Sequence, residues 1–394
     1  MTTRLRPLPV PLGPDALRVL PELERALAGG PALLPHDPAG PPPIDVDTLP
    51  DDAVPDGAAL VVGTSGSTGS PKLAVLGAPA LHASADATAA RLAGPGQWFL
   101  TMPARHIAGL QVLVRSLRAG TVPAVMDLAD GFTPEAFVRG AALLSDDTPT
   151  YVSLVPTQLT RLLADADAAR TLATFAAVLV GGAGTAPTLL ARAQAAGVRV
   201  VTTYGMTETA GGCVYDGLPL EPASVRVVDG RVRLGGATLA SGYLGRADLT
   251  AAAFVEDGGT RWFVTDDLGE VGADGRLRIL GRADDLINTG GLKVAPRLVE
   301  EALLAHGPAV SEAVVVGVPD PEWGQVIAAA LVLHPDAPPA ERRAAADVAA
   351  VRERLRPHLA AHALPRRVIV LGALPLRGPG KPARDEVAGL FARD

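Results

Sequence analysis

The stretch VVGTSGSTGSPKLAV, residues Val61 to Val75, follows an apolar run and gathers glycine, serine and threonine around one lysine, Lys72. Glycines let a backbone approach an anion closely, so that exposed N–H groups point at its oxygens. Hydroxyl groups add further donors, from Thr64, Ser65, Ser67 and Thr68. A Walker A loop would read G-x-x-x-x-G-K-[ST], but here Ser70-Pro71 precedes the lysine. The loop alone predicts a polyphosphate cradle, with a flexible loop that binds no ligand as the alternative.

Apolar runs alternate with helical patterns on both sides of this loop. Strands are predicted at residues 59–62, 98–102, 122–126, 151–155, 176–182 and 198–205, and a helix at Glu135 to Leu144. Strands that alternate with helices are typical of α/β layers around a largely parallel sheet. The first ~55 residues are rich in proline, and residues 35–52 read as an extended surface segment.

The pattern changes after about Gly217, where apolar residues alternate around Asp229-Gly230 and again around Asp274-Gly275. Asp-Gly between alternating strands is a hairpin signature, so a β-rich region is expected from about residue 224 to 280. The remaining ~110 residues resemble a small α+β unit. We therefore predict a large N-terminal domain over residues 1–282, with layered α/β sheets and a β-rich subdomain, and a small C-terminal domain over residues 283–394.

Composition limits the classes of function. The chain has 394 residues, 48% hydrophobic and 20% charged, with a net charge of -7, and the absence of a basic tract argues against nucleic-acid binding. The single cysteine, Cys213, excludes an internal disulfide and is expected to be a small buried side chain. The N-terminus lacks a signal-peptide core, and Gly, Pro and Thr interrupt the longest uncharged run. These features predict a cytoplasmic protein with no stable membrane insertion.

Several other short stretches carry polar groups at the expected ends of strands. Glu208, in TTYGMTE, could hold Mg²⁺, which binds through one or two carboxylates and substrate phosphates; a solvated side chain is the alternative. Gly181-Gly182 end another predicted strand, on the rim where open α/β sheets bind ligands, although a tight turn would explain them equally. Asp266 and Asp267, in TDDLG, could accept from ribose hydroxyls or be exposed hairpin acids.

Two candidates with basic side chains remain. His106, in PARHIAG, has no named catalytic partner, so a place in a pocket wall is favoured. Lys381, in a Pro/Gly-rich loop, is either solvated or delivered to a developing phosphoryl charge.

Taken together, these residues resemble the adenylate-forming superfamily of acyl-CoA synthetases, adenylation domains and luciferase-like enzymes. TSGSTGSPK resembles its phosphate loop, YGMTE its ATP and magnesium motif, TDDLG with GRADDLINTGGLKV its ribose segment and hinge, and GPGK its C-terminal lysine motif. The motifs occur in the family's order from Val61 to Lys381. Within the superfamily, SLVPTQLTRLL and PARHIAGLQVLVRSLRAG most resemble the o-succinylbenzoate–CoA ligases of menaquinone biosynthesis.

The resemblance implies roles for individual residues. The phosphate-binding set is Thr64, Ser65, Gly66, Ser67, Thr68, Gly69 and Lys72. The α-phosphate and Mg²⁺ would be held by Thr207 and Glu208. Adenine would be framed by Gly182, Ala183 and Tyr204, with Gly205 in the same nucleotide-binding set. Ribose would be bound by Asp267 and Arg282. Lys381 would bridge the substrate carboxylate and the α-phosphate.

The implied reaction converts a carboxylate and ATP to acyl-AMP, and then transfers the acyl group to coenzyme A. A mobile small domain would rotate at Asp284, bringing Lys381 to the site first and Gly290-Gly291 afterwards. Arg115, near His106 in sequence, is the candidate partner for the second carboxylate of an aromatic diacid, or else forms a helix-surface ion pair. A homodimer is a family-level expectation.

Four positions depart from the family pattern: Leu73 and Asp266 stand where glycine is usual, and Arg377-Gly378 replaces lysine-threonine. None removes a charged catalytic group, although Leu73 is expected to stiffen the loop exit and change ATP affinity. Two alternatives stay open. The acid could be a fatty, aryl or amino acid, or the chain could be a nucleotide-binding sensor that adenylates nothing.

Overall fold

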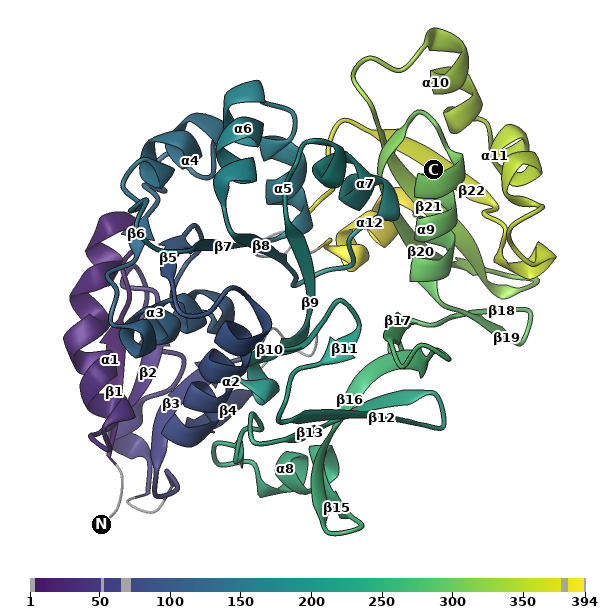
Figure 1. Ribbon diagram of the computed structural model, residues 1–394. Helices are drawn as coiled ribbons and strands as arrows, with labels where there is room; N and C mark the ends of the chain where they lie inside the picture. Colours follow the sequence, from purple (N-terminus) through teal and green to yellow (C-terminus); the bar gives the residue numbers. More distant parts are fainter. Residues whose placement is uncertain (1–3, 51–52, 65–71, 377–381, 393–394) are drawn as a thin grey trace.

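A computed structural model of the chain describes residues 4–50, 53–64, 72–376 and 382–392. Helices and sheets are layered in the first half, a strand-rich region follows, and the C-terminal residues form a compact α+β unit (Figure 1). The predicted α/β class is therefore confirmed. Within the described residues, the helices all fall short of the length and apolarity needed to cross a membrane.

The first sheet has the strand order β1-β2-β3-β4-β14, in which β3 and β4 are antiparallel. Its first two strands and helix α1 form within the proline-rich N-terminal segment, where the sequence predicted no regular structure. They belong to the core, because Leu8, Leu23 and Leu33 are buried. The bounds are β1 Leu5–Pro9, β2 Ala32–His36, β3 Ala58–Gly63, β4 Leu73–Gly77, β14 Gly242–Tyr243, η1 Gly13–Val19, α1 Leu20–Leu27 and η2 Val46–Thr48.

The second sheet has the order β11-β10-β9-β8-β7-β5-β6, and β5 to β9 run parallel, as predicted. Both faces are covered, which explains the continuous apolar runs. Trp98 faces one core cluster and Phe99 the other. The bounds are β5 Gln97–Leu100, β6 Ala124–Val125, β7 Thr150–Leu154, β8 Ala177–Val180, β9 Val200–Met206, β10 Gly211–Tyr215 and β11 Leu218–Pro219.

The helices sort onto the two faces of this sheet. Helices α2 and α3 lie between the first and second sheets, while α4 to α7 cover the opposite face (Figure 1). The helix predicted at Glu135 to Leu144 is α4, which ends three residues earlier. The bounds are α2 Ala78–Arg91, α3 Ile107–Ala119, α4 Pro134–Ala141, α5 Pro156–Leu162, α6 Ala166–Thr174 and α7 Pro187–Ala195.

The predicted β-rich region is a third sheet, β12-β13-β16-β15, with β17 paired to β16. Both predicted hairpins form. Asp229 and Gly230 have φ values of 51° and 76°, the left-handed values that a two-residue hairpin turn requires. The bounds are η3 Thr207–Thr209, β12 Ala223–Val228, β13 Arg231–Gly236, α8 Ala247–Ala253, β15 Phe254–Asp257, β16 Thr260–Val271 and β17 Leu277–Arg282.

The fourth sheet, β19-β18-β21-β20 with β22 beside β21, carries α9 and α11 on one face and α12 on the other. Strand β17 ends at Arg282 and β18 begins at Ile287, while the domain boundary between residues 282 and 283 stays a prediction. The bounds are β18 Ile287–Thr289, β19 Leu292–Val294, α9 Pro296–His306, β20 Val310–Asp320, β21 Gly324–Leu333, α10 Pro339–Ala346, α11 Val348–Leu355, η4 Ala361–Ala363, β22 Arg367–Leu371 and α12 Arg384–Phe391.

Candidate active site

The loop that opened the sequence analysis connects the antiparallel strands β3 and β4. Gly63 pairs with Leu73, and the Thr64 N–H donates to the Lys72 carbonyl at 2.8 Å. A P-loop connects a strand to a helix, so the topology differs from Walker A as the spacing does. The predicted phosphate ligands Ser65, Gly66, Ser67, Thr68 and Gly69 lie outside the described residues.

Leu73, the departure at the loop exit, is part of strand β4. Its side chain is buried, and its carbonyl accepts the Leu244 N–H at 2.8 Å. The residue is thus held by strand pairing on both sides of β4. Its side chain packs in a buried apolar cluster with Val61 and Val75, so an apolar residue fits this strand position.

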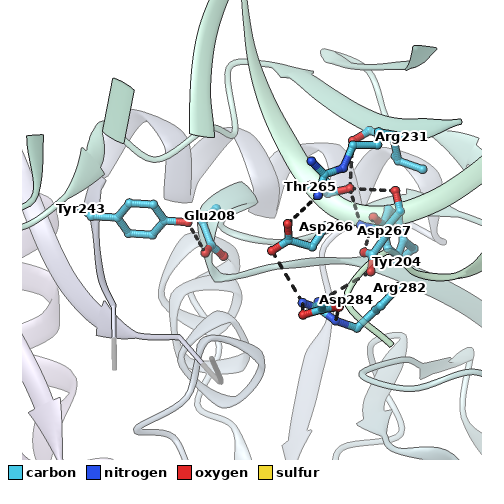
Figure 2. Close-up of polar contacts among 10 residues, drawn as sticks. Tyr204, Glu208, Arg231, Tyr243, Thr265, Asp266, Asp267, Arg282 and Asp284 are labelled. Carbon is cyan, nitrogen blue, oxygen red and sulfur yellow. Dashed lines mark hydrogen bonds and ion pairs between the residues drawn. The ribbon is translucent and has the colours of Figure 1, made fainter. Parts of the chain in front are cut away.

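Glu208 lies in η3, directly after the carboxyl end of β9, and both it and Thr207 are 7% exposed. Tyr243 Oη donates to Glu208 Oε1 at 2.8 Å (Figure 2). Burial raises the pKa of the Glu208 carboxyl, while the hydrogen bond from Tyr243 lowers it. Lys72 Nζ lies 5.5 Å from the centroid of the Tyr243 ring. Tyr243 therefore links the lysine of the phosphate loop to the candidate magnesium ligand.

The backbone around Glu208 depends on glycine. A Cβ atom at Gly205 would lie 2.2 Å from the Gly211 carbonyl oxygen on the paired strand β10. Gly182, in the loop after β8, has a φ of 79°, which favours glycine. Gly182 and Ala183 are exposed on the rim formed by the carboxyl ends of the parallel strands, where the sequence predicted a nucleotide site.

The predicted ribose ligands meet across the strand pair β16–β17, where Asp267 pairs with Arg282. Tyr204 Oη donates to Asp267 Oδ2 at 2.7 Å, and Arg282 Nη1 lies 3.7 Å from Asp267 Oδ1 (Figure 2). Burial raises the pKa of the Asp267 carboxyl, and the Tyr204 hydroxyl opposes that rise. A carboxylate beside a guanidinium offers an acceptor and a donor to vicinal hydroxyl groups.

Arg282 also binds the predicted hinge residue. Its Nε and Nη2 donate to Asp284 Oδ1 and Oδ2 at 2.8 and 2.7 Å, a bidentate pair. These hydrogen bonds raise the pKa of the guanidinium. The hinge position is thereby tied directly to a candidate nucleotide ligand.

The two predicted substrate-binding residues lie apart from each other. His106 immediately precedes α3 and is exposed, whereas Arg115 lies farther along that helix and is buried. Arg115 Nη2 donates to Tyr215 Oη at 3.4 Å, and its guanidinium lies 4.7 Å from the centroid of the Trp98 ring. These contacts do not support the helix-surface alternative, and they favour a packing role for Arg115 over a substrate contact.

Comparison with known proteins identifies the family. The family model described as AMP-binding enzyme matches residues 19–243, and the model of the AMP-binding enzyme C-terminal domain matches residues 298–381. The chain belongs to the AMP-binding enzyme family. The resemblance to adenylate-forming enzymes is thus confirmed.

Individual relatives refine the comparison. A probable 2-succinylbenzoate–CoA ligase from Mycobacterium tuberculosis is 43% identical over 98% of this chain and 99% of its own. The 2-succinylbenzoate–CoA ligase of Geobacillus kaustophilus is 34% identical over 85% of this chain and 70% of its own. Among solved structures, Escherichia coli MenE with a bound analogue of OSB-AMS superposes with a TM-score of 0.72 at 27% identity, covering 100% of this chain and 89% of that one. Bacillus subtilis MenE in complex with OSB-AMP gives 0.69 at 26% identity, covering 93% and 80%.

In this AMP-binding enzyme, the small unit holds the remaining predicted residues. Gly290 and Gly291 form the turn between β18 and β19 with φ values of 59° and 78°. Lys381 lies outside the described residues. The segments that flank its loop are joined by a bridge between Leu376 and Pro382. Arg384, at the start of α12, donates to Glu300 Oε1 at 2.7 Å, which anchors that side of the loop.

The residues present fit the magnesium that the family implies. Across the described ranges, no cluster of three or more histidine, cysteine, aspartate or glutamate side chains forms a metal cage. Mg²⁺ is usually held by one or two carboxylates together with substrate phosphates and water. The buried Glu208 carboxylate, beside the hairpin of the phosphate loop, meets that requirement.

Sequence reasoning missed Tyr243 and Arg231, whose side chains contact predicted site residues (Figure 2). Tyr243 lies in β14, which pairs with β4 next to the phosphate loop. Its place between Gly242 and Leu244 carries no signal that points to Glu208, 35 positions earlier. Long-range strand pairing creates this contact.

Proposed function

We propose that this AMP-binding enzyme is an ATP-dependent, AMP-forming acid–CoA ligase whose acid is 2-succinylbenzoate. The observation that carries the proposal is that β9, which ends beside Glu208, also holds Tyr204 against Asp267, the strand partner of Arg282, in a chain that aligns over 98% of its length with a probable 2-succinylbenzoate–CoA ligase. The second observation is the similarity to structures that contain OSB-AMP or its analogue.

In the first step, a substrate carboxylate oxygen attacks the α-phosphorus of ATP. The bond from that phosphorus to the bridging oxygen breaks, which gives acyl-AMP and pyrophosphate. We assign the β- and γ-phosphates to Thr64, Lys72 and the loop between them, and the α-phosphate to Thr207. Mg²⁺ held by Glu208 would neutralise developing phosphate charge. Lys381 is the proposed cation between the carboxylate and the α-phosphate.

Nucleotide recognition follows from the residues around the strand ends. Tyr204 and the loop at Gly182-Ala183 would border adenine. Asp267 Oδ2 already accepts a hydrogen bond from Tyr204, whereas Asp267 Oδ1 faces Arg282. Oδ1 is therefore the proposed acceptor for a ribose hydroxyl group. Arg282 would donate to the same sugar.

In the second step, the thiol of coenzyme A attacks the acyl carbonyl carbon. The bond from that carbon to the AMP oxygen breaks, the thiol proton is released, and a thioester and AMP leave. Lys381 and the incoming thiol cannot both occupy the reacting centre, so rotation of the small domain at Asp284 would exchange Lys381 for the Gly290-Gly291 turn.

The proposal extends to the cellular location and the oligomeric state of the chain. ATP and coenzyme A are cytoplasmic metabolites, so the cytoplasm is the proposed location. A homodimer is proposed from the family alone, and sedimentation of the purified chain would test it.

The decisive experiment measures pyrophosphate release with MgATP and a panel of carboxylic acids, followed by thioester formation on addition of coenzyme A. We expect turnover with 2-succinylbenzoate to exceed that with benzoate, succinate, fatty acids and amino acids. Glu208→Gln should bind ATP but release little pyrophosphate, whereas Glu270→Gln, an exposed change on β16, should behave as the parent.

A different preferred acid would reject 2-succinylbenzoate and retain the ligase chemistry. Nucleotide binding without pyrophosphate release for any acid would instead support a sensor.

A further inference from the structure

Asp266 occupies a position in β16 where the family pattern has glycine, and its side chain lies between two arginines (Figure 2). Arg231 Nη2 donates to Asp266 Oδ1 at 2.8 Å, and Arg282 Nη2 lies 3.6 Å from Asp266 Oδ2. One arginine comes from β13 and the other from β17, two of the three strands that pair with β16 in the third sheet. The carboxylate therefore connects three adjacent strands beside the candidate ribose site.

The backbone fixes this placement independently of the side chain. The Ala283 N–H donates to the Asp266 carbonyl at 2.8 Å, and Asp267 pairs with Arg282 in the same ladder. A substitution that keeps the size of the Asp266 side chain and removes its charge would leave both backbone contacts intact.

Arg282 is surrounded by three carboxylates that approach different parts of its guanidinium. Asp284 takes Nε and Nη2, Asp267 lies at Nη1, and Asp266 lies on the Nη2 side. The Arg282 side chain is 43% exposed, so packing alone leaves it conformational freedom. Each added carboxylate restricts the orientations that the guanidinium plane can adopt.

We propose that Asp266, held by Arg231, is a positioning residue for ribose recognition: it orients the Arg282 guanidinium toward the hydroxyl groups that Asp267 binds. The inference rests on the proposed nucleotide site. A carboxylate here would by itself repel the triphosphate, and pairing with Arg231 offsets that charge. Asp266 is therefore expected to strengthen contacts with the ribose hydroxyl groups. A comparison of ATP with deoxynucleotides, which lack one of these hydroxyls, measures that contribution.

The experiment compares ATP with 2′-deoxyATP and 3′-deoxyATP, by calorimetric binding and by kcat/KM for pyrophosphate release. The discrimination ratio is the value for ATP divided by the value for a deoxynucleotide. Because these nucleotides carry the same triphosphate, an effect of charge on the triphosphate cancels in this ratio. The variants are Asp266→Asn, Arg231→Gln and the double variant. Glu270→Gln, which breaks an exposed ion pair with Arg278 on the same two strands, is the matched control.

We expect each single variant to lower discrimination about three- to fivefold, the range open to a partly exposed ion pair. The double variant should lose no more discrimination than either single variant, because both substitutions remove the same ion pair between Arg231 and Asp266. The control should keep the parent ratio.

Unchanged binding discrimination in Asp266→Asn, or a double variant equal to the product of the single effects, would overturn the inference. Equal binding of ATP and both deoxynucleotides by the parent chain would overturn the ribose assignment beneath it. Failure of every acid to release pyrophosphate would count against the ligase proposal alone, since the binding ratio is measured without turnover.

Discussion

Replacement of Tyr243 by phenylalanine tests the link between the phosphate loop and Glu208. The substitution removes one hydroxyl group and keeps the ring over which Lys72 lies. It deletes the 2.8 Å hydrogen bond to the buried Glu208 carboxylate. A hydrogen bond to a charged group contributes about 1.5–3 kcal/mol, so kcat/KM for MgATP should fall by about ten- to hundredfold at neutral pH.

The pH dependence gives this prediction its sign. The Tyr243 hydroxyl stabilises ionised Glu208 and lowers its pKa against the effect of burial. Without it the pKa rises further, so the acid limb of the pH–rate profile should move to higher pH. The free energy of unfolding also depends on pH through the pKa of Glu208. A carboxyl whose folded pKa is raised above the ordinary 4.5 loses its stabilising contribution as pH rises through the folded value. The difference in Tm between the variant and its parent should therefore be larger at pH 8 than at pH 5.

The assay follows pyrophosphate release from pH 5.5 to 9 beside thermal unfolding in the same buffers. Tyr151→Phe is the matched control, because Tyr151 Oη donates at 2.9 Å to the neutral Gly94 carbonyl, away from the site. It should lose roughly 1 kcal/mol of stability with no movement of the acid limb. A Tyr243→Phe profile that superposes on that of the parent, with kcat/KM within about twofold, would refute the electrostatic link.

Three further substitutions separate chemistry from packing. Lys381→Ala should abolish acyl-AMP formation and spare thioester formation from supplied acyl-AMP; equal loss of both half-reactions would reject separate roles for the two domain positions. Arg115→Met keeps the apolar stem, and we expect an unchanged KM for 2-succinylbenzoate with Tm shifted by only a few degrees; a raised KM for the acid alone would restore Arg115 as a carboxylate ligand. Gly205→Ala should cost about 1–3 kcal/mol in denaturant unfolding, because its Cβ would meet the Gly211 carbonyl. Gly389→Ala, with open space in α12, is the control and should be neutral or stabilising.

The parts of the fold that the sequence predicted are those with local signals. Continuous apolar runs marked the buried parallel strands, and Asp-Gly pairs marked both hairpins. Strand β1 escaped prediction because Pro7 and Pro9 interrupt it, yet β1 lies at the edge of its sheet, where a missing N–H is tolerated. Pro35 in β2 lies beyond Leu33, the residue that pairs with β3. Prolines that read as a surface segment are thus compatible with a sheet edge.

The candidate site divides in the same way. Glu208 and the Gly181-Gly182 turn were placed on one rim because the ends of the predicted strands are visible in the sequence. The surroundings of Arg115 could not be predicted, because closeness in sequence to His106 was taken as closeness in space. Nine positions along a helix separate two residues by about 13 Å along its axis. Helix α3 carries Arg115 into the layer between two sheets, where Trp98 and Tyr215 contact it.

The departures from the family pattern point to a common physical rule. Glycine at a strand position can be replaced where the new side chain has a partner on an adjacent strand. Leu73 finds one in the apolar cluster under β4, and Asp266 finds one in Arg231 on β13. Gly205 has no such freedom, since its paired strand already lies within contact distance of the missing Cβ. Substitutions at these glycine positions are therefore governed by the neighbouring strand.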